Sequence, residues 1–150
     1  MDTSAYFRIH IRANSDCEEE QAVKYLVRDK VVEYLLPVVA GTNSKDEAKA
    51  CVEKNLKNIE EVANSVLEKN GFSYKSHAEV KKEEFPTRVY EEVTLPEGVY
   101  DALILELGTG SGKNWWCVVY PPLCFSQNIS GKVVYKSWIV EKIKEWKAER

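Results

Sequence analysis

The chain has 150 residues, of which 44% are hydrophobic and 30% charged, a composition typical of one soluble globular domain with its own core. The formal net charge is only −3, which argues against nucleic acid as a partner because a basic surface is missing. No apolar run approaches the roughly 20 residues that span a bilayer. No charged-then-apolar leader opens the sequence either, so we expect any export signal to be absent or removed.

The first predicted element is a strand over residues 6–12, where apolar and polar side chains alternate. Alternation places the two kinds of side chain on opposite faces of the strand, so we expect it to be half buried. The inward side chains are Phe7, Ile9 and Ile11, and the outward ones are Arg8, His10 and Arg12.

Two long helices are predicted next. Ser15 or Asp16 has the capping-box spacing that begins the first helix. Pro37 ends it near Leu36, because the residue before a proline avoids helical angles.

The second helix begins at another capping box, Ser44 with Glu47, and is continuous up to Asn70. Gly71 then provides the left-handed residue that commonly ends a helix.

After Gly71 the hydrophobic period changes from about 3.6 to 2. The pattern predicts a strand over residues 72–80 and a solvated, charged turn over 81–84. Residues 88–95 and 99–107 then form two strands, which Pro96-Glu97-Gly98 joins as a hairpin.

A short strand over residues 115–120 and a terminal helix complete the pattern. The apolar stripe of that helix contains Ile139, Ile143 and Trp146. Grouped rather than alternating elements favour an α+β fold. We therefore predict a single domain over residues 1–150, with an antiparallel-rich sheet and two long helices and a C-terminal helix packed on it.

Three glycines before Lys113 invite comparison with a phosphate-binding loop. That motif requires glycine where Leu107 stands and serine or threonine where Asn114 stands. A strand, rather than a helix, is also predicted to follow, so no helix N-terminus is available to bind phosphate. The glycines, Gly108, Gly110 and Gly112, therefore indicate a flexible connection, and we expect no nucleotide or other cofactor.

Cys117 and Cys124 flank a Pro-Pro turn, where the chain could fold back and join them in a disulfide. The alternative is a pair of buried free thiols that pack as small apolar side chains. No Cys-x-x-Cys pair exists, and His10 and His77 are isolated, so no metal site is expected.

Nucleophilic catalysis would need Cys117 or Cys124 beside His10. A lone histidine on a strand is more often a hydrogen-bonded or surface residue than a catalytic base. No pair of carboxylates has a spacing that selects it for acid–base chemistry. The sequence therefore favours a protein that is not an enzyme.

Trp115 and Trp116 are adjacent in a predicted strand, so their side chains point to opposite faces of the sheet. On a sheet packed on one side only, one tryptophan enters the core. The other must be covered by a helix, by the segment 121–125 or by a partner.

Taken together, these motifs resemble the stage II sporulation protein R family of endospore-forming bacteria over nearly the whole chain. The most specific stretch is 108–125, because it is long and contains rare residues. The departures are small: Tyr120 where phenylalanine is expected, Arg12 where an aliphatic residue is common, and no N-terminal export segment. The other matching motifs are Arg8-Ile9-His10-Ile11, Ala13-Asn14-Ser15-Asp16, Gln21-Ala22, Val27-Arg28-Asp29, Phe85-Pro86-Thr87-Arg88-Val89-Tyr90, Leu95-Pro96-Glu97-Gly98-Val99-Tyr100 and Ala102-Leu103.

The resemblance implies a role that composition does not reveal. Proteins of this family are made in the forespore and exported into the space between the two sporulation membranes. There they activate a membrane-embedded, aspartic-type protease of the mother cell, which removes the pro-sequence of a sporulation sigma factor. We therefore expect a secreted, extracytoplasmic signalling protein that meets the membrane only through this protease. Export also fits a disulfide between Cys117 and Cys124.

We expect the protease to contact polar and aromatic side chains that packing of the hydrophobic core does not account for. Arg28 and Asp29 are expected instead to form a buried ion pair. Two alternatives remain open: a thiol-dependent or other hydrolase acting in the same space, and a purely structural sporulation component. The expected contacts are His10, Asn14, Asp16, Arg88, Tyr90, Asn114, Trp115 and Trp116.

Overall fold

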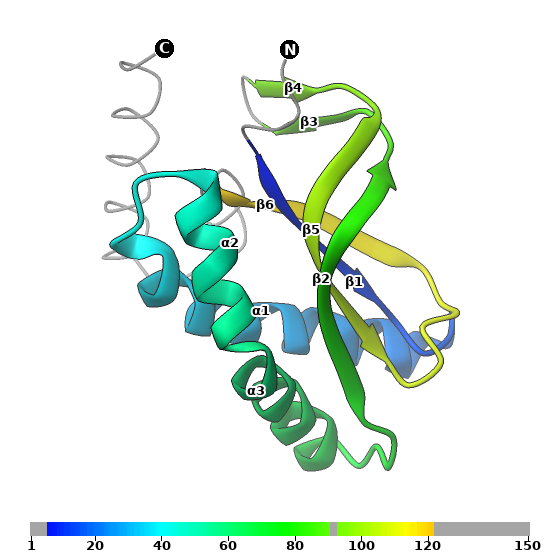
Figure 1. The fold of residues 1–150 in the computed structure, drawn as a ribbon. Coiled ribbons are helices and arrows are strands. Elements are labelled where there is room, and N and C mark those ends of the chain that lie inside the picture. Colours follow the sequence, from blue (N-terminus) through cyan, green and yellow to red (C-terminus); the bar gives the residue numbers. More distant parts are fainter. Residues whose placement is uncertain (1–5, 91–92, 122–150) are drawn as a thin grey trace.

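The computed structural model describes residues 6–90 and 93–121 of the chain. Its centre is a four-stranded mixed sheet in the order β2-β5-β1-β6, formed by Ser76–Phe85, Gly98–Leu107, Phe7–Arg12 and Asn114–Tyr120 respectively (Figure 1). β1 is parallel to β5 and antiparallel to β6, and β2 is antiparallel to β5. The predicted α+β class is therefore confirmed, antiparallel pairings predominate, and the described residues form one domain.

Within residues 6–90 and 93–121, three helices accompany the sheet, namely α1 (Glu18–Ala40), α2 (Lys45–Lys54) and α3 (Leu56–Lys69) (Figure 1). α1 contacts the sheet face that holds Ile11, because Arg28 of this helix stacks on Trp115, the residue opposite Ile11. α2 meets the same face through lysines that bind Asp101, the residue opposite Phe7. We call this face the helix face.

β1 is buried on both faces, so the expectation of a half-buried strand is wrong. Phe7, Ile9 and Ile11 are fully buried on the helix face, as predicted. Arg8 on the opposite face has 0% exposure and His10 only 5%. β1 is a central strand, and long side chains from its neighbours cover its polar face.

The predicted ends of the first helix are also wrong. Cys17, not Ser15 or Asp16, is the N-cap of α1, and its side chain makes no capping hydrogen bond. The carboxylate of Asp16 accepts a hydrogen bond from the backbone of Lys113 instead of capping the helix. Pro37 lies inside the helix, which continues to Ala40. A proline so close to the end removes only one helical hydrogen bond, and burial of Leu36 and Val39 holds the last turn in place.

The second predicted helix is two helices. Its capping box is confirmed, because Ser44 accepts a hydrogen bond from the backbone of Glu47. Asn55 then separates α2 from α3, since its side-chain amide donates to the carbonyl of Cys51 and its oxygen accepts from Tyr34. Such local bonds compete with helical ones. α3 ends as predicted, with Gly71 at a φ of 84°.

Several predictions about the strands are wrong. The strand predicted over residues 72–80 begins only at Ser76, and the single strand predicted over residues 88–95 is divided into two short strands. Residues 81–84 are not a turn, because β2 continues through them to Phe85. Residues 96–98 do not close a hairpin between their flanking strands. The hairpin is formed by β3 (Arg88–Tyr90) and β4 (Val93–Leu95), while β5 pairs with β2 and β1.

The strand predicted over residues 115–120 is confirmed as β6. The predicted terminal helix with Ile139, Ile143 and Trp146 lies outside the described residues. Among the residues that are described, no helix is both long and apolar enough to cross a membrane.

Candidate functional site

The sheet face opposite the helices contains a cluster of charged and aromatic side chains. We call it the polar face. It combines three basic residues of β1 with acidic and aromatic residues of the other strands. Its central members are Arg8, His10, Arg12, Glu83, Phe85, Tyr100, Glu106 and Trp116.

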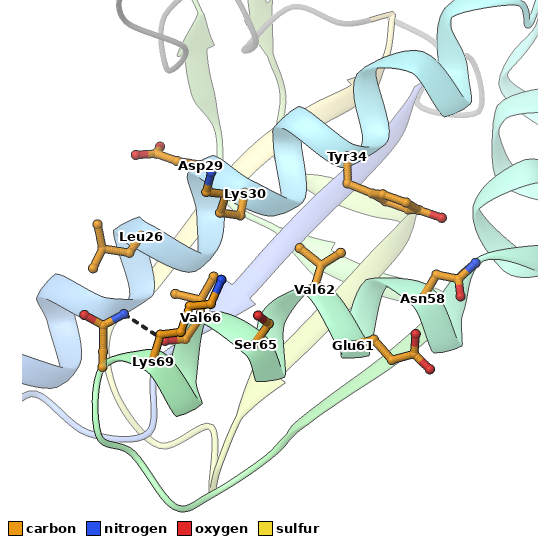
Figure 2. Close-up of a pocket in the computed structure, with 11 residues that line it drawn as sticks. Leu26, Asp29, Lys30, Tyr34, Asn58, Glu61, Val62, Ser65, Val66 and Lys69 are labelled. Carbon is orange, nitrogen blue, oxygen red and sulfur yellow. Dashed lines mark hydrogen bonds between the residues drawn. The ribbon is translucent and has the colours of Figure 1, made fainter.

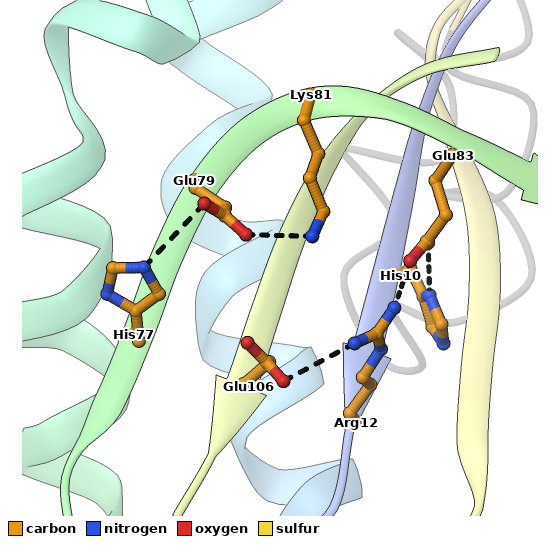
Figure 3. Close-up of polar contacts among 7 residues, drawn as sticks. All are labelled: His10, Arg12, His77, Glu79, Lys81, Glu83 and Glu106. Carbon is orange, nitrogen blue, oxygen red and sulfur yellow. Dashed lines mark hydrogen bonds and ion pairs between the residues drawn. The ribbon is translucent and has the colours of Figure 1, made fainter.

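Glu83 links two residues of β1 across the intervening strand β5 (Figure 3). One carboxylate oxygen accepts a hydrogen bond from His10 Nδ1 at 2.5 Å, and the other accepts one from Arg12. Arg12 also donates to Glu106 at 3.3 Å. His10 Nε2 is buried and has no hydrogen-bond partner among the described residues. The carboxylate thus fixes the imidazole in one orientation.

Arg8 is buried between two aromatic rings. Its guanidinium carbon lies 4.2 Å from the ring centre of Phe85 and 4.6 Å from that of Tyr100. Stacking of this kind lets an arginine stay buried, because the ring faces attract the cation. Burial raises the pKa of Tyr100, although Arg8 acts in the opposite direction.

Trp116 lies between this cluster and the molecular surface. Its ring centre is 5.2 Å from that of His10, and the guanidinium carbon of Arg88 lies 4.4 Å from its ring. Arg88 is exposed, and within residues 6–90 and 93–121 it makes no ion pair. The structure therefore brings together three of the predicted contact residues, His10, Arg88 and Trp116.

Trp115 lies on the helix face, so the prediction that the two tryptophans point in opposite directions is confirmed. Arg28 of α1 stacks on its ring at 5.7 Å. Arg28 also pairs with Asp29 at 2.7 Å, as predicted, but the Asp29 side chain is 48% exposed, so the pair is not buried.

Asn14 and Asp16 bind the glycine-containing loop of the same chain. The side-chain oxygen of Asn14 accepts a hydrogen bond from the backbone of Thr109 at 2.8 Å, and Asp16 accepts one from Lys113 at 2.7 Å. Gly112 lies so close to the carbonyl of Ser15 that a Cβ atom would clash with it. These contacts give both polar residues a structural role and explain why glycine occurs here.

The remaining predicted residues are dispersed. Asn114 is exposed at the start of β6, opposite Arg12. Tyr90 lies at the end of β3, where side chains are not described. Cys117 is buried on β6, and Cys124 lies outside the described residues, so their disulfide stays a prediction.

The structure separates one pair of residues that catalysis would need to be close. Cys117 is opposite Ile9 and faces the helices, whereas His10 faces the other way. Within the described ranges, no group of three or more histidine, cysteine, aspartate or glutamate side chains could hold a metal ion. The structure therefore does not bring Cys117 and His10 together, and Cys124, the other cysteine considered for thiol chemistry, lies outside the described residues.

Sequence reasoning missed six central members of this site, namely Arg8, Arg12, Glu83, Phe85, Tyr100 and Glu106. Residues 81–84 are all charged, so the alternation of apolar and polar side chains stops before Glu83 and gives no local signal for the rest of the strand. This charged run favoured a turn, although β2 continues through it to Phe85.

The chain folds as a small α+β domain. One face of its sheet contains paired acidic and basic side chains packed against aromatic rings. A family model described as Stage II sporulation protein R matches residues 3–130. The chain is also 36% identical over 127 residues to Stage II sporulation protein R of Bacillus subtilis (strain 168). The chain belongs to the stage II sporulation protein R family.

The match covers 85% of this chain but only 57% of the Bacillus subtilis protein. No solved structure matches the chain.

Proposed function

We propose that this domain acts in sporulation as an extracytoplasmic signal that activates a membrane-embedded, aspartic-type protease. The protease would then process a pro-sigma factor, and the domain itself would perform no chemistry. Membership of the stage II sporulation protein R family supports the sporulation role. Secretion from the forespore, the intermembrane location and the identity of the protease are parts of the proposal.

The proposed contact surface is the outer part of the polar face, formed by Arg88 and Trp116. The observation that carries this choice is the stacking of an exposed arginine, without an ion pair in the described chain, on a partly buried tryptophan. Arginine and tryptophan are the residues most enriched among energetically dominant contacts of protein interfaces. His10 would support Trp116 from beneath, held in turn by Glu83.

Activation requires that the domain bind the active state of the protease more tightly than the inactive one. A rigid surface suits this task, because little conformational entropy is lost on binding. The Glu83 bridge and the stacked rings make the polar face rigid.

Reconstitution tests the function directly. The protease would be placed in vesicles with its sigma-factor substrate, and the purified domain added to the face corresponding to the intermembrane space. We expect cleavage to depend on the added domain and to saturate with its concentration. Cleavage that is equal without the domain would contradict the proposal and favour a purely structural role.

A further inference from the structure

A second surface lies on the outer side of the helices, away from the polar face. α1 and α3 border a groove with a volume of about 740 Å³ (Figure 2). Its apolar walls include Leu26 of α1, with 47% of its surface exposed, and Val62 and Val66 of α3. The helix residues that face the core are different ones, such as Val27 and Ala63.

The groove-lining side of α3 has a symmetric pattern. Glu61, Ser65 and Lys69 are spaced by four residues, so they lie along one side of the helix. The two charged residues therefore stand at equal distances on either side of a small one. Neither Glu61 nor Lys69 forms an ion pair within the described part of the chain.

We propose that two copies of this chain associate through the groove about a two-fold axis. The α3 helices cross in antiparallel directions at Ser65, whose small side chain allows close approach. Glu61 of each copy then faces Lys69 of the other, so the interface contains this pair twice. Val62 of each copy packs against Val66 of the other, and Leu26 enters the groove of the other copy.

Charge favours a second copy over another occupant. The rim contains two acidic residues, Asp29 and Glu61, and two basic ones, Lys30 and Lys69. A strongly acidic or strongly basic partner would meet as many like charges as opposite ones. A second copy placed antiparallel meets opposite charges at both ends of α3.

We expect weak association, in the micromolar range. Stable interfaces bury about 800 Å² on each partner, and this groove occupies only one side of two helices. The proposal is independent of the proposed protease, since it concerns the isolated chain.

The test uses two charge reversals, Glu61→Lys and Lys69→Glu, and sedimentation equilibrium of the full chain. Each variant alone places like charges opposite each other twice, so we expect its self-association to weaken by about tenfold or more. An equimolar mixture of the two restores both opposite-charge contacts and should form a heterodimer with near-native affinity.

Glu53→Lys and Lys54→Glu, which reverse charges at exposed positions of α2, provide the matched control pair. They should associate as the native chain does, alone and mixed. Circular dichroism checks that every variant is folded. A native chain that stays monomeric at several hundred micromolar would overturn the proposal, and so would a mixture that fails to associate.

Discussion

Both faces of the central strand β1 are buried, but by different chemistry. On the helix face, Ile9 lies among apolar side chains in the core. On the polar face, Arg8 and His10 are buried by stacking on aromatic rings and by the carboxylate of Glu83. An alternating strand pattern therefore shows which face is apolar, but it does not show which face is exposed.

The largest effect should come from the helix face. Ile9→Ala removes a fully buried side chain, and we expect the free energy of unfolding to fall by about 2–5 kcal/mol. Urea denaturation measures this loss. Val99→Ala, at a position that is 49% exposed, should change it by about 0.5 kcal/mol or less. Similar losses in the two variants would show that the helix face is not the main source of stability.

A smaller but clear loss should come from the polar face. Glu83→Ala leaves His10 without its hydrogen bond and Arg12 without one of its two carboxylate partners, so we expect a loss of about 2–3 kcal/mol. The neighbouring Glu84→Ala is the control, because Glu84 is exposed and points to the other side of β2. If both variants unfold alike, the Glu83 bridge does not stabilise the fold.

The third prediction concerns a charge on the helix face. Burial alone would raise the pKa of Asp101, but hydrogen bonds from Lys45 and Lys82 outweigh it and lower this pKa from 3.8 to about 2. The carboxylate therefore stabilises the folded state above about pH 4, and this stabilisation, roughly 2 kcal/mol, is lost as the pH falls toward 2.

Urea denaturation between pH 7 and pH 2 measures the effect of Asp101. Asp101→Asn should be less stable than the native chain at pH 7, and the difference should shrink as the pH falls. A difference that is independent of pH would contradict the role of the lysines.

Local patterns were sufficient to predict several elements of the fold. The strand at residues 115–120, the cap at Ser44 and the helix end at Gly71 follow from spacing within a few residues. The break at Asn55 and the extension of β2 through Glu83 were not predictable in this way. They depend on Tyr34 and on His10, which lie 21 and 73 residues away in the sequence.

The candidate site, too, could be predicted only where it depends on local sequence. The opposite orientation of Trp115 and Trp116 follows from strand geometry alone. Trp116 contacts His10 and Arg88 because of the register between β1 and β6 and the position of β3, which local sequence does not reveal. Packing of the core does not account for Asn14. Its role is to accept a hydrogen bond from the backbone of Thr109, which lies 95 positions away in the sequence.

The two tryptophans provide the most direct test of the proposed contact surface, because each is stacked with an arginine on its own face of the sheet. Arg88→Ala removes the arginine beside Trp116 on the polar face, and Arg28→Ala removes the one beside Trp115 on the helix face. Both variants would be titrated against the reconstituted protease. We expect Arg88→Ala to need at least about tenfold more protein for half-maximal cleavage, with an unchanged melting temperature, and Arg28→Ala to activate as the native chain does. Native activation by Arg88→Ala, or an equal loss in both variants, would contradict the assignment of the polar face.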